Sequence, residues 1–180
     1  MKSSLTIIAL LTTVILQRLV ELVIARRNER RARARGAREF GASHYPLFFL
    51  LHIGWILGTA FEGTMWPFFE PSFPVTMIFL VLFLGAQALR YAAIVALGDR
   101  WNTRILVVEG EPYIRRGIYQ YLAHPNYVAV CLELFVVPMA VGALYTAMIA
   151  TVVNAVILLR FRLPAEREAL HLLQRNNPID

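Results

Sequence analysis

A polar stretch at residues 117–127, GIYQYLAHPNY, separates two strongly apolar regions and contains the residue types best suited to chemistry. His124, Asn126 and three tyrosines fall within these eleven positions. Pro125 prevents ordinary helical continuation at the residue before it. Such a break between apolar segments is either a binding loop or a plain connector, and local composition alone favours the connector.

A second polar cluster, RFRLPAERE, follows the last apolar run. The two clusters therefore bracket one hydrophobic segment. If that segment is a helical hairpin, its two ends lie on the same side and the clusters meet. The charged members of this second cluster are Arg160, Arg162, Glu166, Arg167 and Glu168.

The order G-x-Y-x-Y-x-x-H-P-x-Y, then a helical hairpin, then R-x-x-x-E, resembles the isoprenylcysteine carboxyl methyltransferase family of integral membrane enzymes, which use S-adenosylmethionine. The resemblance covers roughly residues 85–170. The run from position 101 to 134 looks closer to bacterial members, some of which methylate a hydroxyl of long-chain alkylpyrones or alkylresorcinols. The chain departs from the family at Ala123, often an arginine there, and at Arg167, where a second adjacent acid is common.

The resemblance implies a set of site residues. Arg162 is suited to gripping a carboxylate or enolate, because a guanidinium makes bidentate contacts and stays protonated. Glu166 could accept hydrogen bonds from the cofactor's ribose or amine, and His124 has a binding role in preference to that of a general base. The predicted catalytic residues are Arg162 and Glu166; the predicted cofactor-binding residues are Tyr121, Leu122, His124, Pro125, Asn126, Tyr127 and Glu166; the predicted substrate-binding residues are Arg90, Trp101, Asn102, Glu133 and Arg162; no metal site is predicted.

The resulting hypothesis is a membrane-embedded, S-adenosylmethionine-dependent methyltransferase. It transfers a methyl group to an acidic oxygen, a carboxylate or an enol or phenol hydroxyl, of a lipophilic acceptor such as a prenylcysteine-like or alkylpyrone compound. Two alternatives stay open: a phospholipid N-methyltransferase, and a non-enzymatic membrane scaffold or transport subunit. The last would use its intramembrane polar residues as a structural cluster.

Composition places the chain in a membrane. Of its 180 residues, 58% are hydrophobic, and the mean hydropathy is +0.55, more than a soluble globule carries. The net charge of +6 does not indicate nucleic acid, because the arginines stand beside apolar spans instead of forming a basic domain. The chain is predicted to be one domain, 1–180, with three spans in 1–97 and the cofactor-binding part in 98–180.

The apolar runs predict an all-α integral membrane protein with about five transmembrane helices. The first span is expected to remain uncleaved, since charged residues interrupt it and no small-residue cleavage site follows. Residues 127–159 are too long for one span and are broken near Pro138 and Gly142, so they predict a short hairpin. The expected spans are 5–25, 45–61, 73–97 and the two helices of 127–159.

The connecting segments predict the orientation. Residues 26–44 carry seven arginines against two glutamates, which makes this loop cytoplasmic, whether it is a solvated topology signal or a helix lying on anionic lipid. Residues 62–72 are acidic and are expected outside. Residues 98–126 form a cytoplasmic segment with a β-prone run at 105–108 and a turn at 109–112. An amphipathic helix after Pro164 is expected at the interface, and the membrane is predicted to be the bacterial cytoplasmic membrane, with the active site facing the cytoplasm.

Polar residues inside the spans are expected to gather at one depth. Gln17, Arg18 and Glu21 are helical neighbours in the first span, as are Gln87 and Arg90 in the third. These residues are either functional or a local structural pair. Glu133 requires a partner, with Arg90 and Arg160 as the candidates, and His52 is expected to be a packing residue in preference to a ligand.

Overall fold

The protein is a bundle of membrane-spanning helices, seen here in a computed structural model that describes residues 2–112 and 114–176. Within these residues four helical stretches are long and apolar enough to cross a bilayer, and the shorter apolar helix α4 lies among them. The prediction of an all-α integral membrane protein is confirmed. The α-helices are α1 (Lys2–Ala34), α2 (Tyr45–Met65), α3 (Phe73–Leu97), α4 (Pro125–Met139), α5 (Leu144–Ile157) and α6 (Leu163–Asn176).

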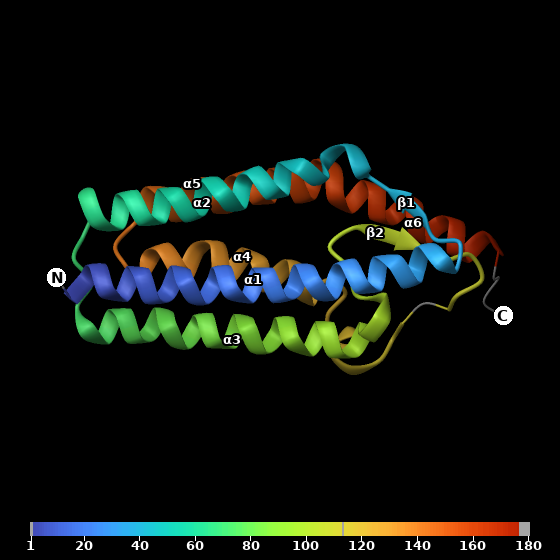
Figure 1. Cartoon of the computed structure of the whole chain (residues 1–180), viewed down its shortest axis with the longest axis horizontal. Helices are drawn as coiled ribbons and strands as arrows, with labels where there is room; N and C mark the ends of the chain where they lie inside the picture. Colours follow the sequence, from blue (N-terminus) through green and yellow to red (C-terminus); the bar gives the residue numbers. More distant parts are fainter. Residues whose placement is uncertain (1, 113, 177–180) are drawn as a thin grey trace.

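The helices run side by side along the long axis of the molecule (Figure 1). Both strands and the long segment between α3 and α4 lie at one end, which we call the site end, whereas the α2–α3 and α4–α5 connections lie at the other. α4 packs against α3 and α5, while α2 packs against α1 and α5. A small antiparallel sheet pairs β1 (Arg38–Phe40) with β2 (Ile105–Val107) at the site end. The β-prone run at 105–108 is thereby confirmed, while the strand at 38–40 was not predicted.

α1 is longer than the first predicted span. It continues past the apolar run to Ala34 because arginine is a good helix former, and Glu29 pairs with Arg33 one turn later at 2.7 Å. Asn28 lies on the buried side of this extension and donates hydrogen bonds to the carbonyls of Trp101, at 2.8 Å, and Gly98, at 3.1 Å. The extension therefore fixes the loop after α3.

The predicted hairpin is confirmed, with its turn at residues 140–143. Pro138 is tolerated in the last turn of α4, and Gly142 adopts a φ of 80° in the turn. The carbonyl of Gly142 accepts a hydrogen bond from the Phe68 amide at 3.0 Å. At 15 residues, α4 is about 22 Å long and is shorter than the hydrocarbon core.

Glu62 belongs to the last turn of α2, so the prediction that a loop begins at this residue was wrong. Its buried carboxylate accepts hydrogen bonds from the backbone amides of Tyr145, at 2.9 Å, and Thr146, at 2.8 Å. These amides are unsatisfied N–H groups of the first turn of α5. Glu62 therefore caps a neighbouring helix.

α5 does not end where the expected short span would. It passes through a π-helical turn, Leu158–Arg162, directly into α6, so that Leu144–His171 forms one apolar helical stretch of 28 residues. Pro164 explains the wide turn, because it has no N–H to donate and its ring would collide with the carbonyl of Arg160 in a regular α-helix. α6 packs against β2, with Ala169 buried, instead of lying free at the interface.

The polar residues of α1, α3 and α4 meet in one buried network, as their common depth predicts. Arg90 is fully buried and binds both oxygens of Glu21, at 3.2 and 3.1 Å, and Oε2 of Glu133. Glu133 also accepts hydrogen bonds from Arg18, at 2.8 Å, and Gln87, at 3.1 Å. Of its two predicted partners Arg90 is confirmed, whereas Arg160 is exposed. Two arginines and two glutamates balance each other in this network.

Candidate functional site

The two motifs bracketing the hairpin meet at the site end, as the sequence predicts. Tyr127 lies in the first turn of α4, and its hydroxyl donates to Glu166 Oε2 at 2.5 Å and accepts from Arg162 Nε at 3.0 Å. His124 stacks on the Tyr127 ring with centroids 5.1 Å apart, and its Nδ1 lies 3.8 Å from Glu166 Oε1. One phenol therefore links an arginine and a glutamate from the far end of the hairpin.

The π-helical turn sets how Arg162 and Glu166 are presented. Arg162 is the last residue of that turn, and Glu166 lies in the first turn of α6. Four residues apart, they are neighbours on a helical surface and face the same phenol. The geometry depends on the helix staying continuous past Pro164.

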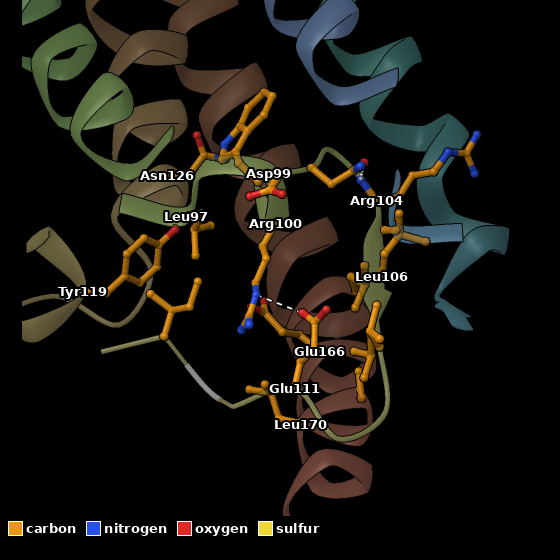
Figure 2. Close-up of a pocket in the computed structure, with 18 of the residues that line it drawn as sticks. Leu97, Asp99, Arg100, Arg104, Leu106, Glu111, Tyr119, Asn126, Glu166 and Leu170 are labelled. Carbon is orange, nitrogen blue, oxygen red and sulfur yellow. Dashed lines mark hydrogen bonds and ion pairs between the residues drawn. The ribbon is translucent and has the colours of Figure 1, made fainter. Parts of the chain in front are cut away.

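A polar cavity of about 220 Å³, which we call the cytoplasm-side cavity for its predicted orientation, lies among α6, β2 and the segments at 97–102 and 111–127. Figure 2 shows Leu106 on β2 with Arg104 just before that strand, Glu166 and Leu170 on α6, and Tyr119 and Asn126 on the opposite side. Its lining mixes acids, arginines and apolar or aromatic side chains. The charged residues are Arg35, Asp99, Arg100, Arg104, Glu111, Arg162 and Glu166.

Glu111 holds the loop that borders this cavity. Its carboxylate pairs with Arg35 of the segment after α1 at 3.0 Å and with Arg100 of the segment after α3 at 2.9 Å, the latter drawn in Figure 2. Among the described residues Asp99 has a single long contact, 3.9 Å from Arg35, and its side chain is 59% exposed. Asp99 therefore keeps most of its hydrogen-bonding capacity for a ligand.

Ion pairs also hold the small sheet against α1. Arg104 Nη1 lies 2.5 Å from Glu39 Oε1, and Arg33 binds the other oxygen of Glu39. Burial alone would raise the pKa of the Glu39 carboxyl, but hydrogen bonds from Arg104 and Arg33 outweigh it and lower that pKa below its usual value. The same hydrogen bond, which Arg104 donates to Glu39, raises the pKa of Arg104. Glu39 thus stays ionised and holds Arg104 at the edge of the cavity.

A second cavity, the intramembrane cavity, measures about 290 Å³ and lies among α1, α2, α4 and α5. Its wall is mostly apolar. Ile15 and Leu19 of α1 and Phe49 and Ile53 of α2 line it, and each of these four side chains is at least 39% exposed on the outer surface of the bundle. The cavity therefore borders the lipid-facing gap between α1 and α2.

The two cavities share part of their lining. Asn102, Asn126, Tyr127 and Arg162 border both. Asn102 is fixed in this position, since its side chain donates to the Ala25 carbonyl at 3.1 Å and accepts from the Arg104 amide at 3.0 Å. A polar ligand on one side and a lipophilic one on the other would thus meet at these four residues.

The structure separates the predicted site residues into three groups. His124, Asn126, Tyr127, Trp101, Asn102, Arg162 and Glu166 line one or both cavities. Tyr121, which is 85% exposed, Leu122 and the buried Pro125 line neither. The predicted substrate residues Arg90 and Glu133 also lie outside both cavities, in the buried network described above.

Sequence reasoning missed other lining residues. Tyr119, Asp99 and Arg104 reach the cytoplasm-side cavity, and Tyr45 and Phe48 reach the intramembrane cavity. Arg104 follows the Trp-Asn pair that was singled out, so its position beside them was the available signal. Tyr45 and Phe48 are ordinary residues of an apolar span, so nothing in the sequence identified them as lining residues.

The structure is an integral membrane bundle in which a polar cavity at one end adjoins an apolar cavity at the level of the helices. Such an arrangement is suited to bring a polar and a lipophilic ligand together. Residues 77–172 match the Isoprenylcysteine carboxyl methyltransferase (ICMT) family. The chain belongs to this family of membrane methyltransferases. It is also 37% identical over 161 residues to the uncharacterized protein YpbQ of Bacillus subtilis (strain 168), covering 89% of this chain and 94% of that protein.

Proposed function

We propose that the protein is an S-adenosylmethionine-dependent O-methyltransferase that methylates an acidic oxygen of a lipophilic acceptor. The acceptor class includes a carboxylate of the prenylcysteine type and an enol or phenol of the long-chain alkylpyrone type. The observation that carries the proposal is the shared border of the two cavities at Asn102, Asn126, Tyr127 and Arg162. Such a border would place a donor and an acceptor in contact without exposing the acceptor's chain to water.

The residues of the cytoplasm-side cavity fit the cofactor's functional groups. Asp99 and Glu166 can bind an amine and ribose hydroxyls, and the arginines around Glu111 can bind a carboxylate. Trp101 and Tyr119, with apolar neighbours such as Leu106, offer a surface for a purine. When bound, the cofactor supplies an electrophilic methyl group on a positively charged sulfur.

Arg162 is the proposed acceptor-binding residue. In the described part of the chain only its Nε is hydrogen-bonded, to Tyr127, so both Nη groups remain for a carboxylate or enolate. Glu166 holds the Tyr127 hydroxyl in place, and the hydroxyl in turn orients Arg162. Asn102 and Asn126 border the same space and can hydrogen-bond the reacting oxygen.

Methyl transfer at this border needs alignment more than acid-base chemistry. A cationic donor and an anionic oxygen lose charge as they approach, so a water-poor site favours the reaction. Holding the reacting atoms in line can supply about 7–11 kcal/mol. A binding role is therefore proposed for His124, with its ring stacked on Tyr127. It would act as a base only for an acceptor that arrives as a neutral hydroxyl.

The proposed orientation puts the site end in the cytoplasm of a bacterium. Five arginines of the α1 extension, at positions 26, 27, 30, 31 and 33, are exposed at that end, whereas the opposite loop carries the exposed Glu70. Positive charge on the cytoplasmic side is the usual pattern. The acceptor would then reach the intramembrane cavity sideways from the bilayer, between α1 and α2.

Binding of S-adenosylhomocysteine tests the cofactor assignment. At one hundred times its Kd it should stabilise the protein by about 2.7 kcal/mol in a thermal unfolding assay. Glu166→Ala should abolish most of this shift, and Arg162→Ala should abolish turnover. Glu168→Ala and Arg160→Ala, exposed neighbours on the same helical stretch, serve as matched controls that should behave as the unmodified protein.

Two outcomes would contradict the proposal. If S-adenosylhomocysteine gives no shift with the unmodified protein, the chain is a scaffold or transport subunit. If the methyl-labelled cofactor transfers its label to an amine headgroup and not to an oxygen, the enzyme is a phospholipid N-methyltransferase. Normal binding and turnover in both site variants would show that the site residues are wrongly assigned.

A further inference from the structure

Two polar side chains lie on the wall of the intramembrane cavity, where the proposed methyl transfer does not use them. His52 of α2 and Asn154 of α5 both line this cavity. The two helices are antiparallel neighbours, with Gly58 against Thr146 and His44 against Phe161. Counting along both helices from these contacts brings His52 level with position 152 or 153, within two residues of Asn154.

Each of these side chains has one polar atom left over. Nδ1 of His52 lies 2.7 Å from the Phe48 carbonyl, and since a carbonyl only accepts, Nδ1 carries the proton and Nε2 is an acceptor. Asn154 uses one end of its amide on the sulfur of Cys131 at 3.2 Å. His52 Nε2 and Asn154 Oδ1 are both shielded from water and have no hydrogen-bond partner among the described residues.

Unpartnered polar atoms on an apolar wall destabilise the folded protein. An aliphatic or aromatic side chain would fill either position without that cost. Arg18, on the third wall of the cavity, also has an unpartnered Nε, which is a donor. One hydroxyl group would suit all three, donating its proton to His52 and accepting from Arg18 or from an Asn154 amide turned end for end.

The depth of this site follows from helix geometry. Asn154 precedes Arg162 by eight residues, and His52 follows Tyr45, at the mouth of the cavity, by seven. At 1.5 Å per residue the polar pair lies roughly 10 Å from the border of the two cavities. An extended hydrocarbon chain covers that distance in roughly eight to nine carbons.

We infer that His52 and Asn154 form a hydrogen-bonding site for a hydroxyl group on the acceptor's chain, on the order of 10 Å from the oxygen that is methylated. The acceptor class is therefore a lipid with an acidic head and a hydroxylated chain, not a plain hydrocarbon tail. The inference rests on the proposed function only for the position of the acidic head at Arg162.

Binding without cofactor tests this inference separately from catalysis. Octadecanoate, 3-hydroxyoctadecanoate and 10-hydroxyoctadecanoate are titrated into the protein in nanodiscs, and their Kd values are compared. The 10-hydroxy acid should bind roughly fivefold more tightly than the other two, as one net hydrogen bond allows. If the three bind equally, the pair is not a hydroxyl site and the inference is wrong.

Variants distinguish recognition of the acceptor's hydroxyl group from a purely structural role in holding α2 against α5. His52→Phe should remove the preference for the 10-hydroxy acid while leaving the melting temperature unchanged or higher, because an unpartnered nitrogen is lost. His52→Gln, which keeps an acceptor, should retain part of the preference, and Leu57→Ala, on the lipid-facing side of α2, should retain all of it. A preference that survives His52→Phe, or a lower melting temperature with all three acids weakened alike, would overturn the inference.

S-adenosylhomocysteine binding distinguishes the two proposals. The His52→Phe protein should bind it as the unmodified protein does, because His52 does not line the cytoplasm-side cavity. Loss of the hydroxyl preference with cofactor binding intact therefore bears on the inference alone. Failure of the unmodified protein to bind S-adenosylhomocysteine bears on the proposed function alone.

Discussion

Tyr127 stands between two side chains of opposite charge, and its hydroxyl has a different hydrogen-bond role toward each. It donates to Glu166 and accepts from Arg162, so the phenol determines where the guanidinium lies. Hydrogen bonds to charged groups contribute about 1.5–3 kcal/mol, more than neutral ones. The position of Arg162 in both cavities therefore depends on a single oxygen atom.

Removing that oxygen should impair the site without unfolding the protein. Tyr127→Phe is expected to lower kcat/KM roughly tenfold or more, because Arg162 and Glu166 lose their shared partner. Steady-state methylation of a lipophilic acid measures the effect. Tyr91→Phe, a half-exposed tyrosine on α3, is the matched control. An unchanged kcat/KM in Tyr127→Phe would exclude a role for the phenol in positioning Arg162.

At the level of single residues, the sequence predicts which residue types form the site better than it predicts which residues contact one another. His124, Tyr127, Arg162 and Glu166 were predicted to meet, because their motif order implies a hairpin, and they do. Arg90 was assigned to the substrate, yet its charge is fully used by Glu21 and Glu133. An arginine inside a span has the same appearance in a sequence whether a ligand or another helix neutralises it.

The turn between α4 and α5 depends on Gly142 for two separate reasons. Its φ of 80° disfavours any side chain, and an added Cβ would lie 2.1 Å from the Phe69 carbonyl oxygen. Gly36 has a similar φ of 84° but open space around it. Comparing substitutions at Gly36 and Gly142 therefore separates the cost of backbone strain from the cost of a steric collision.

Gly36→Ala should cost about 1–2 kcal/mol from strain alone. Gly142→Ala should cost about 1–3 kcal/mol more, because the collision adds to the strain. Reversible unfolding in mixed micelles gives both values. Equal losses in the two variants would show that the turn relaxes away from Phe69 without cost.

The buried network joins three helices through Arg90. Arg90→Met should destabilise the bundle by about 3–5 kcal/mol, because Glu21 and Glu133 then remain buried with Arg18 as their one cationic partner in the described part of the chain. Arg33→Met breaks exposed ion pairs and, in the same unfolding assay, should cost far less, because water and salt screen them. A small loss in Arg90→Met would mean that water or a proton neutralises the acids in its place.

The bounds of a helix were predicted well where a single sequence feature, such as a proline or a glycine, determines them. The third predicted span, 73–97, coincides with α3 because a glycine follows it and proline begins it. The first span was placed too short because apolar content ends before helical structure does. The continuity of α5 with α6 could not be predicted, since a proline usually ends a helix and only packing on β2 shows why this one continues.

For the molecule as a whole, the topology places both motifs on one side of the membrane. In a Cys131→Ser background, Gln120→Cys at the site end should react with a membrane-impermeant maleimide only from the cytoplasm. Ser72→Cys, exposed in the opposite loop, should react only from outside. Intact cells expose the outer side of the membrane to the reagent, and inside-out vesicles expose the cytoplasmic side. Labelling of both positions from the same side would contradict the bundle topology.

The uninterrupted helix from α5 through α6 joins the level of Asn154 to that of Arg162 without any loop between them. Their separation is then fixed by helical rise, so substitutions deep in the bilayer can alter which chain is accepted while the transfer step stays unaltered. Relatives with the same end cavity are free to diverge in the lipids they modify. Diversity among acceptors would accumulate in α1, α2 and the membrane half of α5, and the site end would stay similar.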